Sequence, residues 1–360
     1  MNDMDSASSG ESSARNGSSP PNGSSVPDRS NVPERGTANT RPSRGSIWRL
    51  VRLPNVFTAL ADVALGYLFV TQGTAVNIPL FLLLLGSSAC LYMAGMVLND
   101  VFDVEQDTRE RPHRPIPSGA ISLGVAQQIG WGLLAGGVVL AGCAAGLSLR
   151  ITDLWWRSFV VAIAIAVAIV LYDKFLKTTV WGPVLMGLCR MLNVLLGMSV
   201  AVSRPGTAWG GFDTAELAVA GGMGLFVMGI TWFARREAGE ISRNELWGGI
   251  VLMACGLLTL AAFPNCGEFA RGERTLTIQP PLIWPLLLLL LGSSIVRRCA
   301  VALAAPTPAR VQLAVKQCIL SIVVLDAAVC LAARSPVGWA VGIASLLIPT
   351  LWLGRWIHST

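Results

Sequence analysis

A cluster of carboxyl and amide side chains follows directly after a long apolar stretch of the sequence. The apolar run 79–98 is long enough to cross a bilayer, and it is followed by Asn99, Asp100, Asp103 and Asp107. If the helix continues, the three aspartates lie on one face, because their spacing matches the helical repeat. Like charges beside hydrocarbon call for a compensating cation. Hard oxygen ligands grouped in this way suit Mg²⁺ bound together with a phosphorylated substrate.

Two arginines lie a short distance beyond the acidic cluster. They belong to the segment Arg111-Pro112-His113-Arg114-Pro115, in which the prolines disfavour helix and keep the chain extended. A guanidinium group can bind two phosphate oxygens at once. We therefore expect Arg111 and Arg114 to contact the same phosphates as the metal. Clustering of the charges favours a diphosphate site at a membrane surface over a merely solvated helix end.

A second polar group ends the apolar run 158–172. It consists of Tyr172-Asp173-Lys174-Phe175-Leu176-Lys177. An interfacial anchor has the same composition, because tyrosine prefers the headgroup level and lysine the aqueous side. The alternative is that this group, which lies on the same side as the aspartates, belongs to the site.

A third charged group follows the apolar run 216–234. Glu237 and Glu240 are three residues apart and therefore adjacent on a helix, with Arg235 and Arg236 just before them. Glutamates can ligate Mg²⁺, so the pair is a candidate second metal-binding group. A surface network of arginine and glutamate is the alternative.

Isolated polar residues occur inside several apolar runs, namely Asn55, Asp62, Arg190, Asn193 and Asp326. A charge at the centre of a span costs about 2.5–3.5 kcal/mol on insertion scales, so these side chains should face the interior of the bundle. Arg190 paired with Asp62 would be a structural contact. Substrate binding by Arg190 and Asn193 is the other possibility, and Asp326 is expected to be structural.

Long apolar runs must position these groups. The chain has 360 residues, of which 53% are hydrophobic and 13% charged, with a mean hydropathy of +0.58. Continuous apolar runs of this length predict an all-α, polytopic transmembrane bundle. We expect nine to ten spans, because the last two candidates are separated by a very short turn. The candidates are 54–71, 79–98, 124–148, 158–172, 181–202, 216–234, 246–263, 281–297, 311–332 and 336–354.

Lysine and arginine are distributed unequally between the two sides of such a bundle. The side that carries the N-terminus, the acidic cluster and Arg355 holds about three times as many as the other. The positive-inside rule therefore predicts an integral protein of the cell membrane with both termini and the active-site loops in the cytoplasm. Residues 1–45 contain few large apolar side chains and are expected to form a disordered cytoplasmic tail that is retained. Residues 46–360 would form the membrane domain.

The composition also excludes several classes of protein. The net charge of +6 gathers at the ends of the spans, which argues against a nucleic-acid-binding surface. The eight cysteines show no close pairing, so neither a disulfide framework nor a zinc site is indicated. The oligomeric state stays open.

The first polar cluster resembles the first signature of the UbiA superfamily of intramembrane prenyltransferases. The matching residues are Asn99-Asp100-x-x-Asp103-x-x-x-Asp107, then Arg111-Pro112, Arg114-Pro115-x-Pro117-Ser118-Gly119 and Ile121-Ser122. The similarity of span order and loop position extends over roughly residues 46–300. The resemblance implies that an isoprenoid moves from its diphosphate onto an acceptor within the bilayer. An aromatic ring is the commonest acceptor in the family.

The resemblance also implies roles for individual residues. Mg²⁺ would be held on the diphosphate by Asn99, Asp100, Asp103 and Asp107. Lys177 would contact the diphosphate and Tyr172 would steady the leaving group or the carbocation, because both match a Tyr…Leu-Lys element of the family. Family members carry two aspartates, four residues apart, where this chain has Glu237 and Glu240. An altered site, a one-metal site and lost activity are all compatible with that substitution.

These observations predict a Mg²⁺-dependent prenyltransferase whose partners are a prenyl diphosphate, a small acceptor and the lipid bilayer. The predicted catalytic residues are Asp100, Asp103, Asp107, Tyr172 and Lys177. The predicted substrate-binding residues are Asn55, Asn99, Arg111, Arg114, Lys177, Arg190 and Asn193. The predicted metal ligands are Asn99, Asp100, Asp103, Asp107, Glu237 and Glu240. A carrier or export component for an isoprenoid lipid, or a lipid diphosphate phosphatase, is the alternative.

Overall fold

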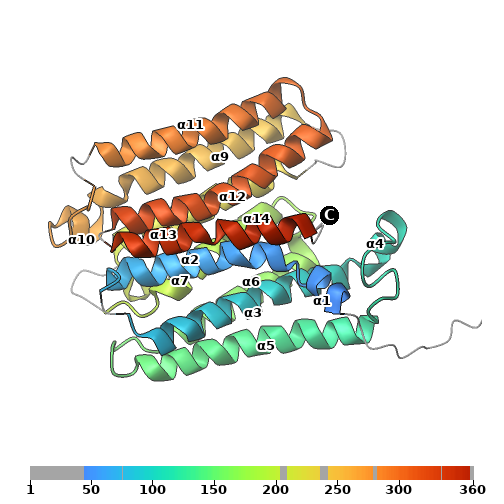
Figure 1. Cartoon of the computed structure of the whole chain (residues 1–360), viewed down its shortest axis with the longest axis horizontal. Helices are drawn as coiled ribbons and strands as arrows, with labels where there is room; N and C mark the ends of the chain where they lie inside the picture. Colours follow the sequence, from blue (N-terminus) through green and yellow to red (C-terminus); the bar gives the residue numbers. More distant parts are fainter. Residues whose placement is uncertain are drawn as a thin grey trace, which may run out of the picture. The chain divides into compact units, whose positions relative to one another are not determined.

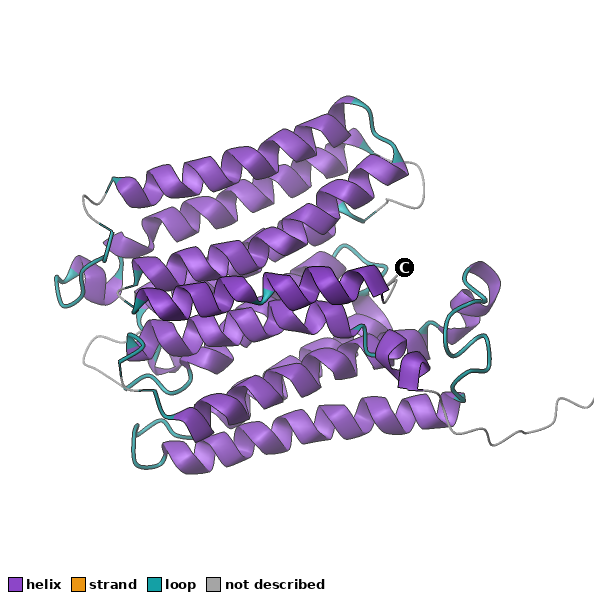
Figure 2. Cartoon of the chain, in the orientation of Figure 1, coloured by secondary structure: helices purple, strands orange, loops and turns teal. Residues whose placement is uncertain are grey.

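The computed structural model of the chain is helical, with no strand among the residues that it describes (Figure 2). Those residues are 44–74, 76–202, 209–235, 242–278, 282–333 and 335–356. The chain divides into Met1–Arg41 and Pro42–Thr360, and every described helix belongs to the second unit. The predicted N-terminal tail therefore falls almost entirely outside the described residues.

Fourteen α-helices and three short irregular helical turns make up the described part of the chain. The α-helices are α1 (Arg44–Leu50), α2 (Leu53–Thr71), α3 (Ile78–Phe102), α4 (Val104–Glu110), α5 (Leu123–Ser148), α6 (Arg157–Leu171), α7 (Gly182–Met198), α8 (Thr214–Phe233), α9 (Arg243–Ala262), α10 (Gly267–Ala270), α11 (Ile283–Ala304), α12 (Pro308–Ala332), α13 (Val337–Ser345) and α14 (Leu347–Trp356). The turns are η2 (Tyr172–Leu176), η3 (Trp209–Gly211) and η4 (Phe263–Asn265).

The long helices correspond to the predicted spans. Nine helical stretches within the described residues are long and apolar enough to cross a membrane, with hydropathies from 1.5 to 2.3. The last of them, Val337–Arg355, combines α13 and α14. The remaining candidate is α7, an apolar helix of 17 residues. The prediction of an all-α polytopic bundle is confirmed.

Successive long helices run in alternating directions, because short connections join them (Figure 1). One end of the bundle therefore gathers the last turns of α3, α6 and α8 with the first turns of α2, α5, α7 and α9. The short helices α1 and α4 lie at this same end (Figure 1). We refer to it as the α4 end.

Several helices extend beyond their predicted limits at the α4 end, and α11 and α12 are two of them. The span predicted to end at residue 297 continues as α11 to Ala304, so Arg297 and Arg298 lie within the helix. The following span, predicted from residue 311, begins at Pro308. Hydropathy underestimates both helices because helical hydrogen bonding continues through residues that are too polar for an apolar run.

Close contact of glycines brings α2 against α7. A Cβ atom added to Gly66 would lie 2.2 Å from the carbonyl oxygen of Val194, and one added to Gly197 would lie 2.3 Å from that of Val63. Small residues permit such backbone contact between helices in lipid. The polar side chains of α2 and α7 are thereby brought within hydrogen-bonding distance of each other.

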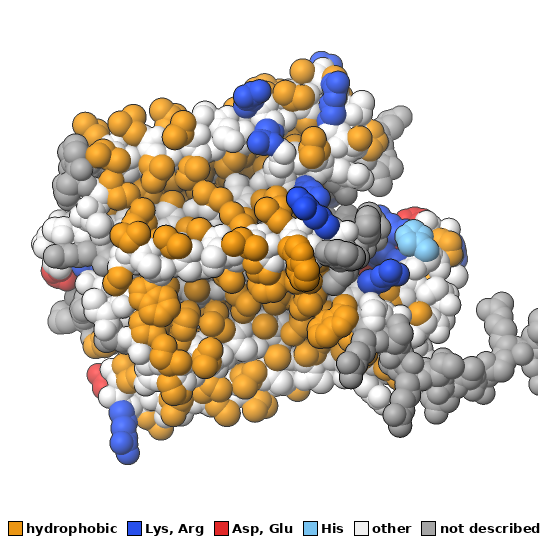
Figure 3. Space-filling model, viewed as in Figure 1, with side chains coloured by type: hydrophobic (Ala, Val, Ile, Leu, Met, Phe, Trp, Pro, Cys, Tyr) orange, Lys and Arg blue, Asp and Glu red, His pale blue; other side chains and the backbone are white. Residues whose placement is uncertain are grey.

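Hydrophobic side chains cover most of the face seen in Figure 3, and basic side chains gather toward the ends of the helices. Leu286, Leu289 and Leu290 of α11 are each more than half exposed. Exposed leucines in this number suit a surface in contact with lipid rather than with water.

Candidate active site: a cavity at the α4 end

The acidic motif spans a break between two helices. α3 ends at Phe102, Asp103 has φ −88° and ψ 5°, and α4 begins at Val104. Backbone hydrogen bonds continue across the break, from Asp103 N to Asn99 O at 3.0 Å and from Asp107 N to Asp103 O at 2.8 Å. Because most side chains of α4 are polar, this helix turns out of the apolar bundle. The expectation of one continuous helix with all three aspartates on one face is therefore corrected.

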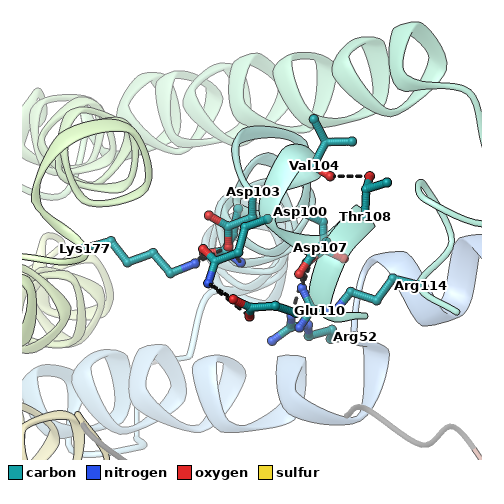
Figure 4. Close-up of polar contacts among 11 residues, drawn as sticks. Arg52, Asp100, Asp103, Val104, Asp107, Thr108, Glu110, Arg114 and Lys177 are labelled. Atoms are coloured by element: carbon teal, nitrogen blue, oxygen red, sulfur yellow. Dashed lines mark hydrogen bonds and ion pairs between the residues drawn. The ribbon is translucent and has the colours of Figure 1, made fainter. Parts of the chain in front are cut away.

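Two of the aspartates share an arginine. Arg114 Nη1 lies 3.2 Å from Asp100 Oδ1 and 2.6 Å from Asp107 Oδ2 (Figure 4). Asp100 also accepts a hydrogen bond from Arg52 Nη2 at 3.1 Å. Both carboxylates are buried, and the guanidinium groups provide the compensating charge that burial demands. Arg114, which the sequence predicts to contact phosphate, therefore pairs with two carboxylates in the structure.

The third aspartate faces a lysine that is distant in sequence. Lys177 Nζ donates hydrogen bonds to Asp103 and, at 2.8 Å, to Asn99 Oδ1. Asn99 Nδ2 in turn donates to Asp103 Oδ2 at 3.3 Å. These side chains form one polar group, defined here as the Asp103 triad of Asn99, Asp103 and Lys177. Residues of the first and second polar clusters, which the sequence predicts to share one site, are thus in direct contact.

A wide helical turn positions Lys177. The last turn of α6 continues as the π-helix η2, Tyr172–Leu176, and Lys177 N bonds to Tyr172 O at 2.9 Å. Such π turns are frequent at functional sites. This turn brings Tyr172 and Asp173 to the interior cavity, whereas Phe175 is exposed.

Polar side chains of α7 and α2 form a second network deeper in the bundle. Arg190 Nη1 lies 2.5 Å from Asp62 Oδ2, and Arg190 Nη2 donates to Thr58 Oγ1 at 2.7 Å. Asn193 Nδ2 donates to Asp62 Oδ2 at 3.0 Å, and Ser88 Oγ donates to Asn193 Oδ1 at 2.7 Å. The structure therefore contains the contact between Arg190 and Asp62 that the sequence suggested.

A cavity of about 430 Å³ joins these groups. Among its lining residues are nine predicted site residues, namely Asn55, Asn99, Asp103, Arg111, Arg114, Tyr172, Lys177, Arg190 and Asn193. Its remaining wall is largely apolar and includes Leu91, Ile165, Ile169, Val227, Ile230, Ile319 and Ile322. The cavity therefore has a charged end and an apolar wall, as an amphiphilic substrate requires.

Other predicted site residues lie elsewhere. Asp100 and Asp107 do not line the cavity but lie behind Arg114, with which they pair. Glu237 and Glu240 lie outside the described residues. Arg111 lines the cavity and forms no ion pair within the described part of the chain.

Arg52 is a cavity residue that the sequence analysis missed. It lines the cavity, pairs with Asp100 and adopts the left-handed region with φ 47° and ψ 49°. Such a conformation costs a non-glycine residue on the order of 1–3 kcal/mol and is frequent at functional sites. The available signal was its position as the last cation before the first span, on the same side as the aspartates.

The donor set at the charged end fits Mg²⁺ that arrives with a substrate. Asn99 and Asp103 present amide and carboxylate oxygens to the cavity, and Mg²⁺ is commonly bound by one or two carboxylates together with substrate phosphates. Within the described residues, no group of three acidic, histidine or cysteine side chains forms a site for a metal on its own. Phosphate oxygens and water would complete the coordination.

Most of the cavity residues fall within a region shared with known proteins, whereas Arg52, Asn55, Ile319 and Ile322 lie outside it. Residues 59–243 match the model of the UbiA prenyltransferase family. The chain is 33% identical over 150 residues to digeranylgeranylglyceryl phosphate synthase of Metallosphaera sedula, which is 41% of this chain and 49% of that protein. It is 34% identical over 155 residues to the enzyme of the same name from Saccharolobus solfataricus, or 42% and 50% of the two chains. The match thus spans about half the length of these curated relatives.

Solved structures share the fold. One, from work on digeranylgeranylglyceryl phosphate synthase in membranes, has a TM-score of 0.57 and 22% identity, covering 81% of this chain and 98% of the other. A UbiA homologue from Archaeoglobus fulgidus bound to GPP and Mg²⁺ has a TM-score of 0.57 and 14% identity, covering 83% and 99%. With the family match over more than half of its residues, the chain belongs to the UbiA prenyltransferase family.

Proposed function

We propose that this protein transfers a prenyl group from a prenyl diphosphate to an acceptor inside the bundle. The observation that carries the proposal is a single cavity with the Asp103 triad and Arg111 at one end and an apolar wall. A diphosphate suits the charged end, and an isoprenoid chain suits the isoleucines and leucine of the wall. Family membership supports the same chemistry.

The charged end would act on the leaving group. Arg111 is available to phosphate oxygens, and Lys177 can exchange its carboxylate partner for them. Mg²⁺, when bound at Asn99 and Asp103, supplies further positive charge against the departing diphosphate. Fixed cations that stabilise developing negative charge lower the barrier to departure.

The proposed transfer breaks one bond to C1 of the prenyl group and forms another. The bond between C1 of the prenyl group and the diphosphate oxygen breaks, and the electron pair leaves with the diphosphate. The apolar wall excludes water from the allylic cation, and Tyr172 presents an electron-rich ring at the charged end. A nucleophilic atom of the acceptor then bonds to C1 and loses its proton to an oxygen of the departed diphosphate.

We propose a glyceryl phosphate lipid, rather than an aromatic ring, as the acceptor. The relatives named above are digeranylgeranylglyceryl phosphate synthases, which favours an alcohol that carries a phosphate. Its hydroxyl oxygen would attack C1. Arg190, which lines the cavity away from the acidic motif, provides a cation for the acceptor while Asp62 and Thr58 hold its guanidinium group.

A product assay tests the proposed function directly. Purified full-length protein with Mg²⁺ receives labelled geranyl or geranylgeranyl diphosphate, together with either a glyceryl phosphate lipid or an aromatic acid. The expected product is the prenylated glyceryl phosphate, identified by mass. Release of free prenyl alcohol and phosphate would identify a phosphatase, and tight binding without any product would identify a carrier. Prenylation of the aromatic acid alone would overturn the proposed acceptor.

We further propose that the α4 end faces the cytoplasm, as the excess of lysine and arginine at this end supports. Arg109 in α4 and Arg150 after α5 are exposed at opposite ends of the bundle. Arg109→Cys and Arg150→Cys variants are treated in intact cells with a membrane-impermeant maleimide. Labelling of the Arg150→Cys variant and protection of the Arg109→Cys variant are expected. The reverse pattern would overturn the orientation.

A further inference from the structure

A second cavity lies between α11 and α12, apart from the proposed active site. Its volume is about 600 Å³. The charged residues of its lining are Arg297 and Arg298 from α11 and Arg310 from α12. Leu290 and Leu313 contribute apolar surface to the same cavity. We call this cavity the basic groove.

The basic groove lies near the α4 end of α11 and α12, where spans of this length would meet the lipid headgroups. Arg297 and Arg298 are about two helical turns before the end of α11, which places them roughly 10 Å along the helix from its last residue. Arginine side chains at this depth extend toward the headgroups. Figure 3 shows lysine and arginine side chains gathered over this end of α11 and α12, beside hydrophobic side chains.

No carboxylate of the residues that the structure describes compensates the positive charge of the groove. Between residues 283 and 325 the sequence contains no aspartate or glutamate. In the described part of the chain, none of the three groove arginines forms an ion pair. Arg310 Nη1 makes only a 3.4 Å hydrogen bond to Ala305 O. Three adjacent guanidinium groups therefore remain available to an anion.

Several other arginines of the same bundle have carboxylate partners. Arg274 pairs with Glu268 at 2.6 Å, and Arg271 pairs with Asp213 at 3.0 Å, both at the end opposite α4. Arg190 pairs with Asp62 within the bundle. The protein thus compensates these arginines internally, whereas no carboxylate of the described residues pairs with the groove arginines.

We infer that the basic groove binds the phosphate of an anionic glycerophospholipid from the surrounding leaflet. Guanidinium groups bind phosphate oxygens in pairs, and basic pockets between membrane helices recognise anionic headgroups. Free phosphate shares the headgroup chemistry, but only a lipid has chains that can lie along Leu290 and Leu313. Both leucines are more than half exposed and lie beside the arginines in the groove.

The bound lipid would contact the outer side of a helix that also serves the active site. Ile319 and Ile322 of α12 line the proposed active-site cavity, whereas Leu313 and Gln317 of the same helix line the basic groove. Lipid binding is therefore expected to stabilise α12. Such stabilisation would raise the unfolding temperature of the whole bundle by mass action.

The test compares anionic with zwitterionic lipid on the full-length protein in detergent. Dioleoylphosphatidylglycerol or dioleoylphosphatidylcholine is added, and binding is read by native mass spectrometry and by the thermal unfolding midpoint. We expect retention of phosphatidylglycerol and a raised midpoint with that lipid only. Glycerol 3-phosphate serves as the soluble arm and should give neither effect at the same concentration.

Matched variants locate the binding to the groove. The Arg297→Gln/Arg298→Gln double variant should bind phosphatidylglycerol roughly tenfold or more weakly. Lys316→Gln removes an exposed cation of α12 that does not line the groove, and it should bind as the wild type does. Unchanged unfolding without added lipid shows that the double variant is folded; if it is not, Arg310→Gln replaces it.

Three results would overturn the inference. These are equal binding of the two lipids, equal loss of binding in Lys316→Gln and in the groove variants, and binding of glycerol 3-phosphate as strong as that of the lipid. Because the groove shares no residue with the proposed active site, these measurements stand whether or not prenyl transfer is observed.

Discussion

Lys177 donates a hydrogen bond to the carboxylate of Asp103 across a separation of 74 residues in sequence. The contact joins the turn that follows α6 to the break between α3 and α4. It places a cation and an anion side by side at the charged end of the cavity (Figure 4). Either partner can be offered to a diphosphate, the lysine directly and the carboxylate through a metal.

Asp103→Asn should abolish most of the prenyl transfer. The substitution keeps the shape of the side chain but removes the charge that faces the cavity, so turnover should fall roughly 10²–10³-fold. Product formation under saturating prenyl diphosphate measures the effect. Glu105→Gln is the matched control, because Glu105 is an exposed acid of α4 and does not line the cavity. Equal activity of the Asp103→Asn variant and the wild type would exclude a role in transfer.

Lys177→Gln should lower kcat more than it raises KM, because the lysine would meet charge that develops as the diphosphate leaves. A loss on the order of 10²-fold in kcat is expected. Lys174→Gln, in the same turn but exposed, should retain activity. A change confined to KM would instead assign Lys177 to ground-state binding.

Removal of Mg²⁺ should stop turnover reversibly. Chelation with EDTA leaves Asp103 and Asn99 without the ion that would bridge them to phosphate oxygens. Product formation should return when Mg²⁺ is added back, and Ca²⁺ should restore it poorly because it is larger and less strict in geometry. Full activity in EDTA would contradict the assignment of the Asp103 triad.

Breaking the contact between Arg190 and Asp62 should destabilise the bundle. Asp62 is fully buried and Arg190 nearly so, and removal of one partner of a buried pair costs about 3–5 kcal/mol. Asp62→Asn should therefore lower the thermal unfolding midpoint. Asp62→Asn combined with Arg190→Gln should lower it by less than the sum of the single changes. Asp153→Asn, at an exposed loop position, is the control.

Gly66→Ala should disturb the packing of α2 on α7. The new methyl group would meet the carbonyl oxygen of Val194 at 2.2 Å, and overpacking of this kind costs about 1–3 kcal/mol. Gly136→Ala in α5 meets no atom within 4 Å and should be neutral. Thermal unfolding of the two variants decides the question, and equal midpoints would refute the proposed backbone contact.

The apolar runs and the polar residues at their ends could be predicted from the sequence because both properties are local. About 20 apolar residues suffice to specify a span, and the types of side chain in Asn99–Asp107 specify hard oxygen ligands. The structure places Asn55, Tyr172, Lys177 and Asn193 in the lining of one cavity, and their roles in the site stay predictions. The acidic motif indicated the family, and the apolar runs indicated the fold class.

Several features required the tertiary structure. At the break between α3 and α4, Asp103 contacts Lys177, whereas Asp100 and Asp107 contact Arg114. Arg52 becomes a partner of Asp100 only when α2 and α3 are packed. The same holds for the basic groove, which exists only between two helices whose ends hydropathy underestimates.

The physical reason is the difference in range between the interactions. Hydropathy and helical hydrogen bonding depend on neighbouring residues, so the sequence by itself determines the spans and the chemistry of the acidic motif. The choice of a charge partner depends on helix packing across the bundle, through contacts such as that of Gly66 with Val194. Only the tertiary structure decides that Lys177 meets Asp103 while Arg114 meets Asp100 and Asp107.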